Sequence, residues 1–347
     1  MSPTNDGKGE PGMGYYLLGH GGSADHGSED RVRGICRVLP EQPELYSAAL
    51  EEDWRYGLGE LAGLNQHLPG GPEGISSEDW KVLLTPALGD RLTKGDRALL
   101  WGWTPGAENL SRRMIRRLRK FHSVVVTDPE SVKLLCAAGL EKTVRLGPDP
   151  SFLVKRQLRG LHGAFRKETV GLCVSPAVRR FEQRQGVLYR GYCHLIQWVL
   201  EHTDWQVALI PYCVKPGCND ELLLKVLEQR FGKTGRILRR GDGDCRVLRG
   251  DLSMCRCCVG TAGALAGWSC GVPGLCIGSS VRARNLSRML YETADPVVSV
   301  GSLRREEDLT VRFQAFLRRE DMLRQRLERS VNQYHRWAMD WAWQDAV

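Results

Sequence analysis

The chain has 347 residues, of which 42% are hydrophobic and 26% charged, and its formal net charge is +8. This length suits two domains of ordinary size, and the composition is that of a globular protein with a buried core. No stretch approaches the roughly 18 to 20 apolar residues of a membrane-spanning helix, which excludes that class of protein. The positive charge favours anionic partners such as phosphates and acidic glycans, without choosing among them.

Residues 1–13 are polar, rich in glycine and proline, and without the apolar segment of a secretory signal. We interpret them as a disordered lead-in and expect a cytoplasmic protein with at most peripheral membrane contact. The twelve cysteines are spread along the chain, so we interpret them as reduced thiols and not as a disulfide framework. Cys255 and Cys258 form a CxxC without a second Cys/His pair at zinc-ribbon spacing, and we expect no metal site.

The densest run of cations lies at 112–120, where Met114, Ile115 and Leu118 share one face of a predicted helix. The cations then cover its solvated face. No aromatic residues are interleaved with them, as a platform for stacked bases would require. We therefore expect no nucleic-acid partner, while the sequence leaves the oligomeric state undetermined.

Short β-branched runs alternate with longer amphipathic stretches, which is typical of βαβ units around a parallel sheet. The first such series defines an N-terminal lobe over 14–155, and Asp128 and Pro129 stand at the N-cap and first position of one of its helices. The strands predicted for this lobe are 15–19, 44–48, 98–102, 123–128 and 143–147. The predicted helices are 28–39, 107–121 and 130–138.

Residues 156–168 lack periodicity and are interpreted as a linker, after which the pattern restarts in a C-terminal lobe over 169–303. Its predicted strands are 169–174, 206–211, 255–260, 274–278 and 296–300, and its predicted helices are 186–202, 220–229, 262–268 and 282–290. Residues 304–347 predict C-terminal helices with a break near their middle. We expect the aromatic residues of this tail to pack against a lobe, namely Tyr334, Trp337, Trp341 and Trp343.

These elements predict an α/β fold with two Rossmann-like lobes, each built on a parallel sheet, and a helical C-terminal tail. The arrangement is GT-B-like. In such folds, ligands bind beyond the carboxyl ends of the strands, which places the expected ligand cleft between the lobes.

The sharpest local feature is the His- and Gly-rich turn at 19–29, which joins the first strand to a helix. Its glycines let a ligand approach the backbone, and the helix N-terminus offers free N–H groups to an anion. Ser28 could cap that helix, and Glu29 suits its positive end. We predict that His26 and His20 transfer protons and that the remaining polar positions bind substrate, namely Gly22, Ser23, Asp25, Ser28 and Glu29. The alternative is a tight turn whose side chains only cap.

Two turns of the second lobe share this strand-to-helix character. Arg282 and Arg284 flank a helix start, where cations oppose the helix dipole unless an anion is bound. The junction at Gly260 and Thr261 is built for close backbone approach. We predict an anion-binding site at Gly260, Thr261, Gly278, Ser280, Arg282 and Arg284, without the residues alone identifying the anion.

Several short motifs occur in a fixed order from about Tyr15 to Leu290, and together they resemble the polysaccharide pyruvyl transferase family, in its bacterial exopolysaccharide-type branch. The motifs are His20-Gly21-Gly22-Ser23, His26-Gly27-Ser28-Glu29, Leu100-Trp101-Gly102, Glu130-Ser131, Pro148-Asp149-Pro150-Ser151-Phe152, Gly171-Leu172-Cys173-Val174-Ser175-Pro176, Ile210-Pro211-Tyr212, Asn219-Asp220, Gly271-Val272-Pro273 and Gly278-Ser279-Ser280-Val281-Arg282-Ala283-Arg284.

The resemblance implies a GT-B-like fold and transfer of a pyruvyl group from phosphoenolpyruvate to a sugar of a cell-surface polysaccharide. Phosphoenolpyruvate would be the donor substrate, no cofactor is implied, and the acceptor would be a sugar or a lipid-linked glycan. Arg282 stands where the family usually has a lysine.

The sequence departs from the family at loop positions. After Gly260, the family's Arg-Thr-His or Arg-Leu-His triplet is replaced by Thr261-Ala262-Gly263, and its Arg-Glu-Ser is Pro129-Glu130-Ser131. The Gly-Gly-Asp segment expected before Leu100 is absent. Two alternatives therefore stay open: a catalytically degenerate relative that binds a glycan or an anion, and a nucleotide-sugar glycosyltransferase on the same two-lobed plan.

Overall fold

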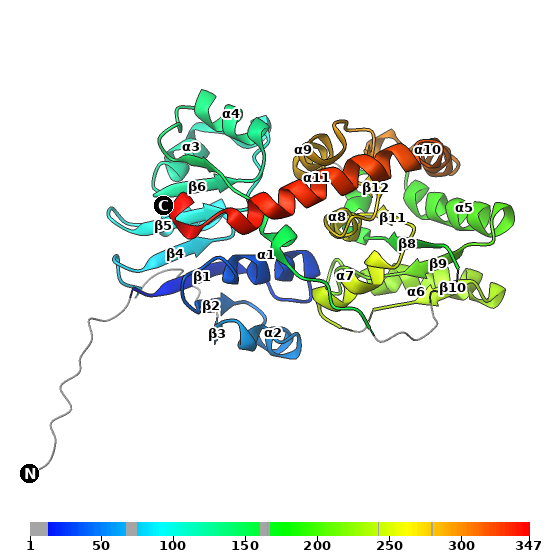
Figure 1. Cartoon of the computed structure of the whole chain (residues 1–347), viewed down its shortest axis with the longest axis horizontal. Coiled ribbons are helices and arrows are strands. Elements are labelled where there is room, and N and C mark those ends of the chain that lie inside the picture. The colour runs from blue at the N-terminus through cyan, green and yellow to red at the C-terminus, as the bar shows by residue number, and fades with distance from the viewer. Residues whose placement is uncertain (1–12, 67–74, 160–164, 166, 242, 279) are drawn as a thin grey trace, which may run out of the picture.

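The computed structural model describes residues 13–66, 75–159, 165, 167–241, 243–278 and 280–347. Most of the predicted lead-in and part of the predicted linker lie outside the described residues. Two parallel sheets form the cores of two lobes (Figure 1). Among the described residues, no helix is long and apolar enough to cross a bilayer.

The N-terminal lobe contains a seven-stranded sheet in the order β3-β2-β1-β4-β5-β6-β7. Its central strands are short and mostly buried, as parallel strands covered by helices on both faces must be. They are β1 (Tyr15–His20), β2 (Glu44–Ser47), β3 (Gly63–Gln66), β4 (Trp80–Leu83), β5 (Arg97–Trp101), β6 (Ser123–Val126) and β7 (Val144–Leu146). The helices of this lobe are α1 (His26–Cys36), α2 (Leu50–Arg55), α3 (Arg112–Leu118) and α4 (Pro129–Ala137).

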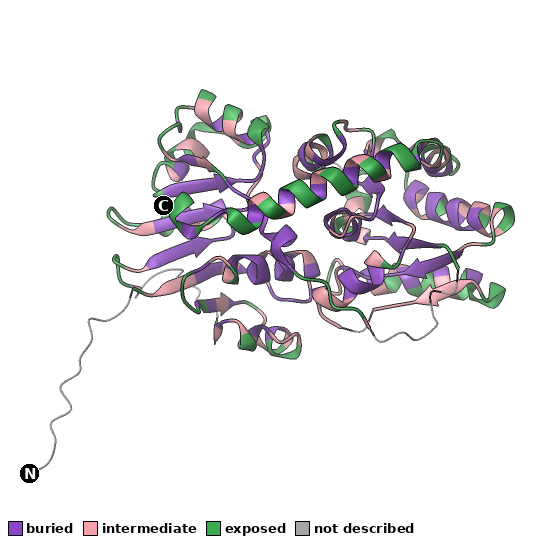
Figure 2. Ribbon diagram, viewed as in Figure 1, coloured by how far each residue is buried: buried purple, intermediate pink, exposed green. Residues whose placement is uncertain are grey.

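The C-terminal lobe contains a six-stranded sheet in the order β10-β9-β8-β11-β12-β13. Its strands are β8 (Thr169–Cys173), β9 (Gln206–Leu209), β10 (Ile237–Arg239), β11 (Cys257–Gly260), β12 (Gly274–Ile277) and β13 (Val297–Val298). The helices of this lobe are α5 (Val187–His202), α6 (Asp220–Phe231), α7 (Cys245–Ser253), α8 (Ala262–Ser269) and α9 (Val281–Tyr291). In Figure 2 the central strands of both lobes are mostly buried, the edge strands β3 and β10 are only partly buried, and the helices expose their outer faces. The predicted fold class is confirmed.

One predicted helix is divided in the structure. The segment predicted as a helix at 107–121 contains a short 3-10 turn, Ala107–Asn109, and then α3. Ser111 separates them, because its Oγ accepts a hydrogen bond from Met114 N at 3.2 Å and starts a new helix. The basic residues of α3 do lie on its exposed side, while Leu118 is buried.

The helical tail is broken as predicted, into α10 (Asp308–Leu317) and α11 (Glu320–Asp340), and it ends in a 3-10 turn, Trp343–Asp345. Helix α11 runs from the C-terminal lobe back to the first one (Figure 1). There the Trp341 ring lies 4.8 Å from the Trp101 ring, and the Trp343 ring 5.4 Å from that of Trp80. The tail therefore completes the hydrophobic core of the N-terminal lobe.

The order of strands fixes where a ligand can enter. Strand order reverses between β1 and β4 in the first sheet, and between β8 and β11 in the second. In open α/β sheets, the crevice at such a reversal is the place where ligands bind. The turns that follow β1 and β11 are the two glycine-rich turns that the sequence singled out, and both lie at these positions.

Candidate functional site

The turn after β1 is shaped by glycine and capped by Asp25. Gly22 has a φ of 102°, and a Cβ there would lie 2.5 Å from the Ala49 Cβ, so only glycine fits. The Asp25 carboxylate accepts hydrogen bonds from Gly27 N at 3.1 Å and Ser28 N at 3.3 Å. The N-cap of α1 is therefore Asp25 and not Ser28, and the helix begins at His26, two residues earlier than predicted.

The His20 side chain is held inside the turn by partners on two helices, α1 and α2. Its Nε2 lies 3.0 Å from Asp53 Oδ1, and its Nδ1 lies 3.1 Å from Ser28 Oγ. Ser23 donates to the same Asp53 oxygen through its backbone N and its Oγ. Burial raises the pKa of Asp53, but the hydrogen bonds from His20, Ser47 and Ser23 outweigh it and hold the pKa below its usual value. His20 and Ser23 thus stabilise the turn by binding Asp53, a carboxylate from α2 that the sequence did not reveal.

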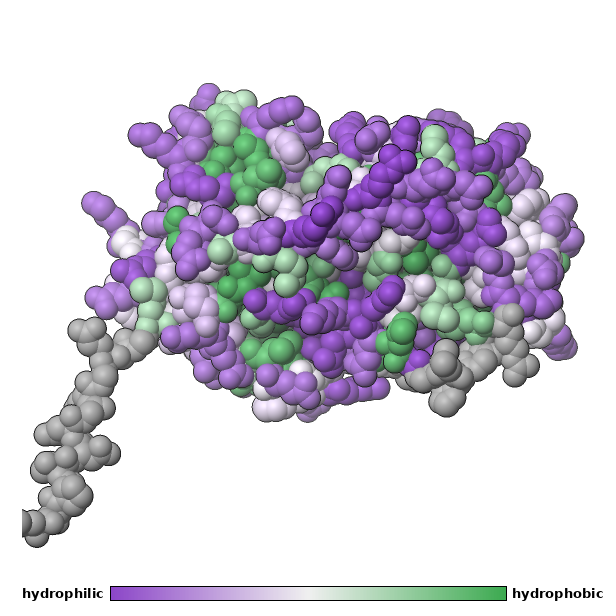
Figure 3. All heavy atoms as spheres, in the orientation of Figure 1, coloured by the Kyte–Doolittle hydropathy of each residue, from purple (hydrophilic) through white to green (hydrophobic). Residues whose placement is uncertain are grey.

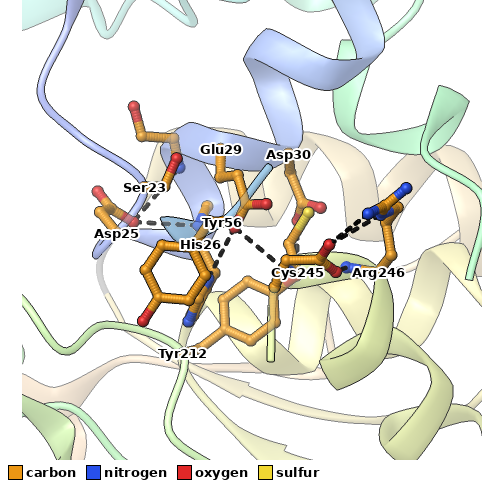
Figure 4. A network of polar contacts seen from close by, with 12 residues as sticks. Ser23, Asp25, His26, Glu29, Asp30, Tyr56, Tyr212, Cys245 and Arg246 are labelled. Carbon is orange, nitrogen blue, oxygen red and sulfur yellow. Dashed lines mark hydrogen bonds and ion pairs between the residues drawn. The ribbon is translucent and has the colours of Figure 1, made fainter. Parts of the chain in front are cut away.

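His26 has a different environment (Figure 4). Its Nδ1 lies 2.8 Å from Glu29 Oε2, an oxygen that also accepts a hydrogen bond from Cys245 N at 3.1 Å. The edges of the Tyr56 and Tyr212 rings surround the imidazole, with ring centres 5.1 and 5.9 Å away. Nε2 is buried, and it has no hydrogen-bond partner among the described residues. The carboxylate of Glu29 therefore orients His26 and can stabilise its protonated form.

Glu29 also joins the two lobes. Its Oε1 accepts a hydrogen bond from Arg33 Nε at 2.7 Å, while Cys245 begins helix α7 of the other lobe. Burial lowers the pKa of Arg33, but the charge and the hydrogen bond of Glu29 raise it by more. Both oxygens of the Glu29 carboxylate are occupied by protein donors. Glu29 can therefore affect a bound ligand only through His26.

The turn after β11 faces the turn after β1. Gly260 has a φ of 145°, and a Cβ there would lie 1.9 Å from Cys173 O, so the backbone of β8 requires glycine. Thr261 N donates to Cys173 O at 2.9 Å, and the Thr261 side chain makes no hydrogen bond to the N-terminus of α8. A Cβ at Gly27 would lie 3.8 Å from the Ala262 Cβ. The structure therefore brings the N-termini of α1 and α8 together, as a two-sided site for an anion requires.

Arg282 binds a carboxylate of the opposite lobe. Its Nε and Nη2 lie 2.7 and 2.6 Å from Asp149 Oδ2, and Nη2 donates to Ser151 Oγ at 3.1 Å. Burial raises the pKa of Asp149, but Arg282 and Ser151 lower it by more. Ser280 caps α9 by accepting a hydrogen bond from Ala283 N, and a Cβ at Gly278 would meet open space. Arg282 thus links the lobes while flanking this space.

Arg284 points into a separate cavity of about 490 Å³ between the lobes. The cavity is lined on one side by Glu108, Glu130 and Lys133, and on the other by Arg284 and Arg288 of α9. Arg282 and Arg284 therefore do not face the same point. Glu130 and Ser131 of the N-terminal lobe line this second cavity as well.

The sequence did not single out Arg31. This residue follows Gly27 by four positions and lies on the same face of α1. Its Cδ would lie 3.7 Å from a Cβ at Gly102, and its nearest charges include Arg282, Asp149 and Asp25. Burial and the repulsion of Arg282 lower the pKa of Arg31. Among the described residues, Arg31 has no hydrogen bond or ion pair. The spacing of Gly27 and Arg31 along a helix is the signal that could have revealed it.

Two further residues of the C-terminal lobe reach the turn after β1. Lys215 Nζ donates to Gly21 O at 3.1 Å. Asp220 Oδ2 accepts hydrogen bonds from Tyr212 N and Cys213 N, both at 2.9 Å. Burial raises the pKa of Asp220 to about 7 despite these bonds, with Asp25 adding to the shift. The cleft thus contains a carboxyl group that exchanges protons near neutral pH.

All twelve cysteines are free thiols. Within the described residues, no three His, Cys, Asp or Glu side chains are grouped so that they could hold a metal ion.

The two lobes, with their facing sheets and a cleft at the carboxyl ends of the strands, define the GT-B type of fold. No family model matches the sequence, and no curated protein matches it significantly. Solved structures do match.

Staphylococcus aureus MnaA, determined with UDP, aligns with a TM-score of 0.65 at 11% identity, over 93% of this chain and 92% of that one. A transferase of Siraitia grosvenorii, in complex with UDP, aligns at 0.59 and 10% identity over 95% and 96%. Anabaena HepE, in complex with UDP and glucose, aligns at 0.56 and 10% identity over 94% and 95%.

At these identities the likeness establishes the fold alone. The structures that align include the S. grosvenorii transferase and a UDP-N-acetylglucosamine 2-epimerase, and none of those reported above is a pyruvyl transferase. The resemblance to the pyruvyl transferase family therefore stays a hypothesis.

Proposed function

We propose that this protein is a GT-B-type enzyme that binds a nucleoside-diphosphate sugar in the cleft between its lobes and transfers the sugar to an acceptor. The observation that carries the proposal is Arg31. It is a partly buried arginine whose pKa is lowered by its surroundings and which has no ion-pair partner among the described residues. Such a cation is costly to bury unless an anion joins it.

The surroundings of Arg31 suit a diphosphate. The N-termini of α1 and α8 meet beside it and present backbone N–H groups, which bind phosphate oxygens well. Arg282 adds a second positive charge from the opposite lobe. The structures of S. aureus MnaA, Anabaena HepE and the S. grosvenorii transferase contain UDP, which makes a uridine nucleotide the first ligand to test.

His26 is the proposed general base. Its Nε2 would take the proton of the acceptor hydroxyl as the oxygen attacks the anomeric carbon and the bond from that carbon to the diphosphate breaks. Glu29, on Nδ1, would stabilise the imidazolium that forms. Because the His26 side chain is buried, an acceptor reaches Nε2 only when Tyr56 or Tyr212 moves aside.

Ligand binding measured by thermal shift and calorimetry tests the proposal. UDP and UDP-glucose are expected to raise the melting temperature of the wild-type protein. Arg31→Met should weaken UDP binding about 10- to 100-fold, the range for losing a hydrogen bond to a charged group. Arg113→Met, on an exposed part of α3, is the matched control and should bind UDP normally.

The same measurements separate the other hypotheses. Binding of phosphoenolpyruvate without binding of UDP, followed by phosphate release with a glycan acceptor, would favour pyruvyl transfer. That second candidate is favoured by the turn after β1, which contains two buried histidines, His20 and His26. Tight binding of a glycan without turnover would point to a non-catalytic relative.

A further inference from the structure

Another cavity, different from the one beside Arg284, has a volume of about 680 Å³ and lies away from the carboxyl ends of the strands. It is bounded by the C-terminal end of α1, by residues 152–156, which lead from the first lobe toward the second, and by α11. Because α1 has 11 residues and rises about 1.5 Å per residue, this cavity lies about 15 Å from His26. Its volume is within the range of about 300 to 1,000 Å³ that small-molecule sites occupy.

One part of the cavity is apolar. Phe152 and Val331 are buried in its wall, and Met339 contributes the end of a flexible side chain. Figure 3 shows the face that carries α11, where apolar atoms gather beneath the hydrophilic outer surface of this helix. An alkyl chain placed here would be removed from water at a gain of about 0.8 kcal/mol per buried CH₂.

The rim of the cavity is cationic. Lys155 and Arg156 are exposed, and the described residues offer neither of them a hydrogen-bond acceptor or an ion-pair partner. Arg37 contributes a third cation, whose guanidinium donates to Leu153 O. Glu328 is the one acidic residue lining this part of the described chain. The lining thus combines a net positive rim with an apolar interior.

An unsatisfied polar atom lies in the same wall. Nε2 of His335 is inaccessible to water, and it lacks a hydrogen-bond partner among the described residues. Buried polar atoms of this kind are rare unless water or a ligand meets them. It provides a polar contact inside an otherwise apolar part of the cavity.

We propose that this cavity is a second binding site, separate from the cleft, for a single amphipathic anion: a phosphate or carboxylate head on a medium-length alkyl chain. The head is held by Lys155 and Arg156, and the chain lies against Phe152, Val331 and Met339. Since the cavity is a bounded space beneath α11, the occupant is one free molecule and not a membrane surface.

Calorimetry with dodecyl phosphate, below its micelle concentration, tests the site on the full chain. One molecule per chain is expected to bind. The double variant K155E/R156E should weaken binding at least about 10-fold, because hydrogen bonds to charged groups contribute about 1.5 to 3 kcal/mol. Dodecanol, which has the chain without the charge, should bind at least about 10-fold more weakly for the same reason.

Two more variants keep the test independent of folding and of the proposed function. Asn332→Trp places a bulky side chain on the exposed, cavity-lining side of α11 and should block binding, while Arg329→Glu, exposed on the same helix outside the lining, should not. Arg31→Met, in the cleft, should bind dodecyl phosphate normally even if UDP fails to bind. Equal binding of dodecanol and dodecyl phosphate, full binding by K155E/R156E, or binding only to anionic vesicles would each overturn the proposal.

Discussion

Asp30 of the first lobe and Arg249 of the second form a two-pronged ion pair across the interface between the lobes. Nε and Nη2 of Arg249 lie 2.7 and 3.0 Å from the two carboxylate oxygens of Asp30, and the residues are 1% and 2% exposed. Tyr212 donates its hydroxyl to the same carboxylate at 2.6 Å. The interface between the lobes thus contains a buried ion pair that is also hydrogen-bonded to Tyr212.

We expect Arg249→Met to destabilise the protein by about 3 to 5 kcal/mol, because it leaves the charge of Asp30 buried without its counter-ion. The free energy of unfolding in urea measures this. The double variant D30N/R249M should recover much of the loss, since neither charge remains. Arg319→Met, which breaks the exposed pair with Asp295, should change stability far less. Equal effects of the two single variants would contradict this view of the interface.

Gly34→Ala should be strongly destabilising. A Cβ at Gly34 would lie 1.8 Å from Pro150 O, where α1 packs against the 3-10 turn Pro150–Leu153. Overpacking of this kind costs about 1 to 3 kcal/mol and sometimes more. The unfolding midpoint in urea gives the measurement. Gly232→Ala is the matched control, because its nearest neighbour, Glu228 Cγ, is 3.9 Å away and its backbone is helical.

The pKa of Asp220, raised by burial from 3.8 to about 7, makes stability depend on pH in a predictable direction. Between about pH 4 and 7 the folded protein keeps a proton that the unfolded chain has lost, so this residue makes stability fall as the pH rises. Asp220→Asn retains the oxygen that accepts from Tyr212 N and removes the titration.

Relative to wild type, the Asn variant should therefore gain stability from pH 4 to 7, by about 4 kcal/mol at most. Urea unfolding at several pH values measures the difference between the two proteins, which cancels the titration of all other groups. Parallel curves for variant and wild type would show that Asp220 ionises normally.

Removal of the His26 imidazole should impair catalysis without weakening the binding of UDP. His26→Ala should lower turnover about 100- to 10,000-fold, the usual contribution of a general base, while UDP binding stays within a small factor. His20→Ala should instead reduce thermal stability, because His20 joins Asp53 to Ser28. Steady-state kinetics with calorimetry for UDP compares the two variants. Full turnover by the His26 variant would remove this residue from the mechanism.

Cys213 and Cys218 should form a disulfide on mild oxidation, because their Sγ atoms lie 2.9 Å apart. One thiolate displaces glutathione from oxidised glutathione, and the second thiol then displaces the other glutathione. Burial raises the pKa of Cys213, so the reaction should speed up from pH 7 to 9. Mass spectrometry detects the loss of two hydrogens, and Cys218→Ser should retain a mixed disulfide instead.

The sequence predicted most strands of both sheets, but it missed the edge strands β3 and β10 and also β4, which lies at the centre of the first sheet. The run at β6 is Val-Val-Val and fully buried, so its pattern is unambiguous. Strand β3 reads Gly-Leu-Asn-Gln and is only partly buried, and its pairing with β2 is a tertiary effect that local pattern does not encode. Helix α7 was missed because four of its nine residues are charged or glycine, which obscures its apolar pattern.

For the site, the sequence located the turns but not the partners of their side chains. The glycines after β1 and β11 show where the backbone must bend, whereas Asp53 and Arg282 find their partners 33 and 133 residues away. Arg282 was expected to hold a donor anion, and the structure gives it Asp149. Such pairings depend on how the two lobes dock, which is decided by packing across the whole interface.

The return of the tail to the first lobe bears on how the protein is made. The N-terminal lobe leaves the ribosome early, yet Trp341 and Trp343 pack into its core beside Trp80 and Trp101. Until the second lobe has been synthesised, these apolar rings lack their partners, and such exposed surface promotes aggregation. Folding of the first lobe is therefore completed only by residues that are translated after the second lobe, and the folding intermediate of the first lobe is the state most in need of a chaperone.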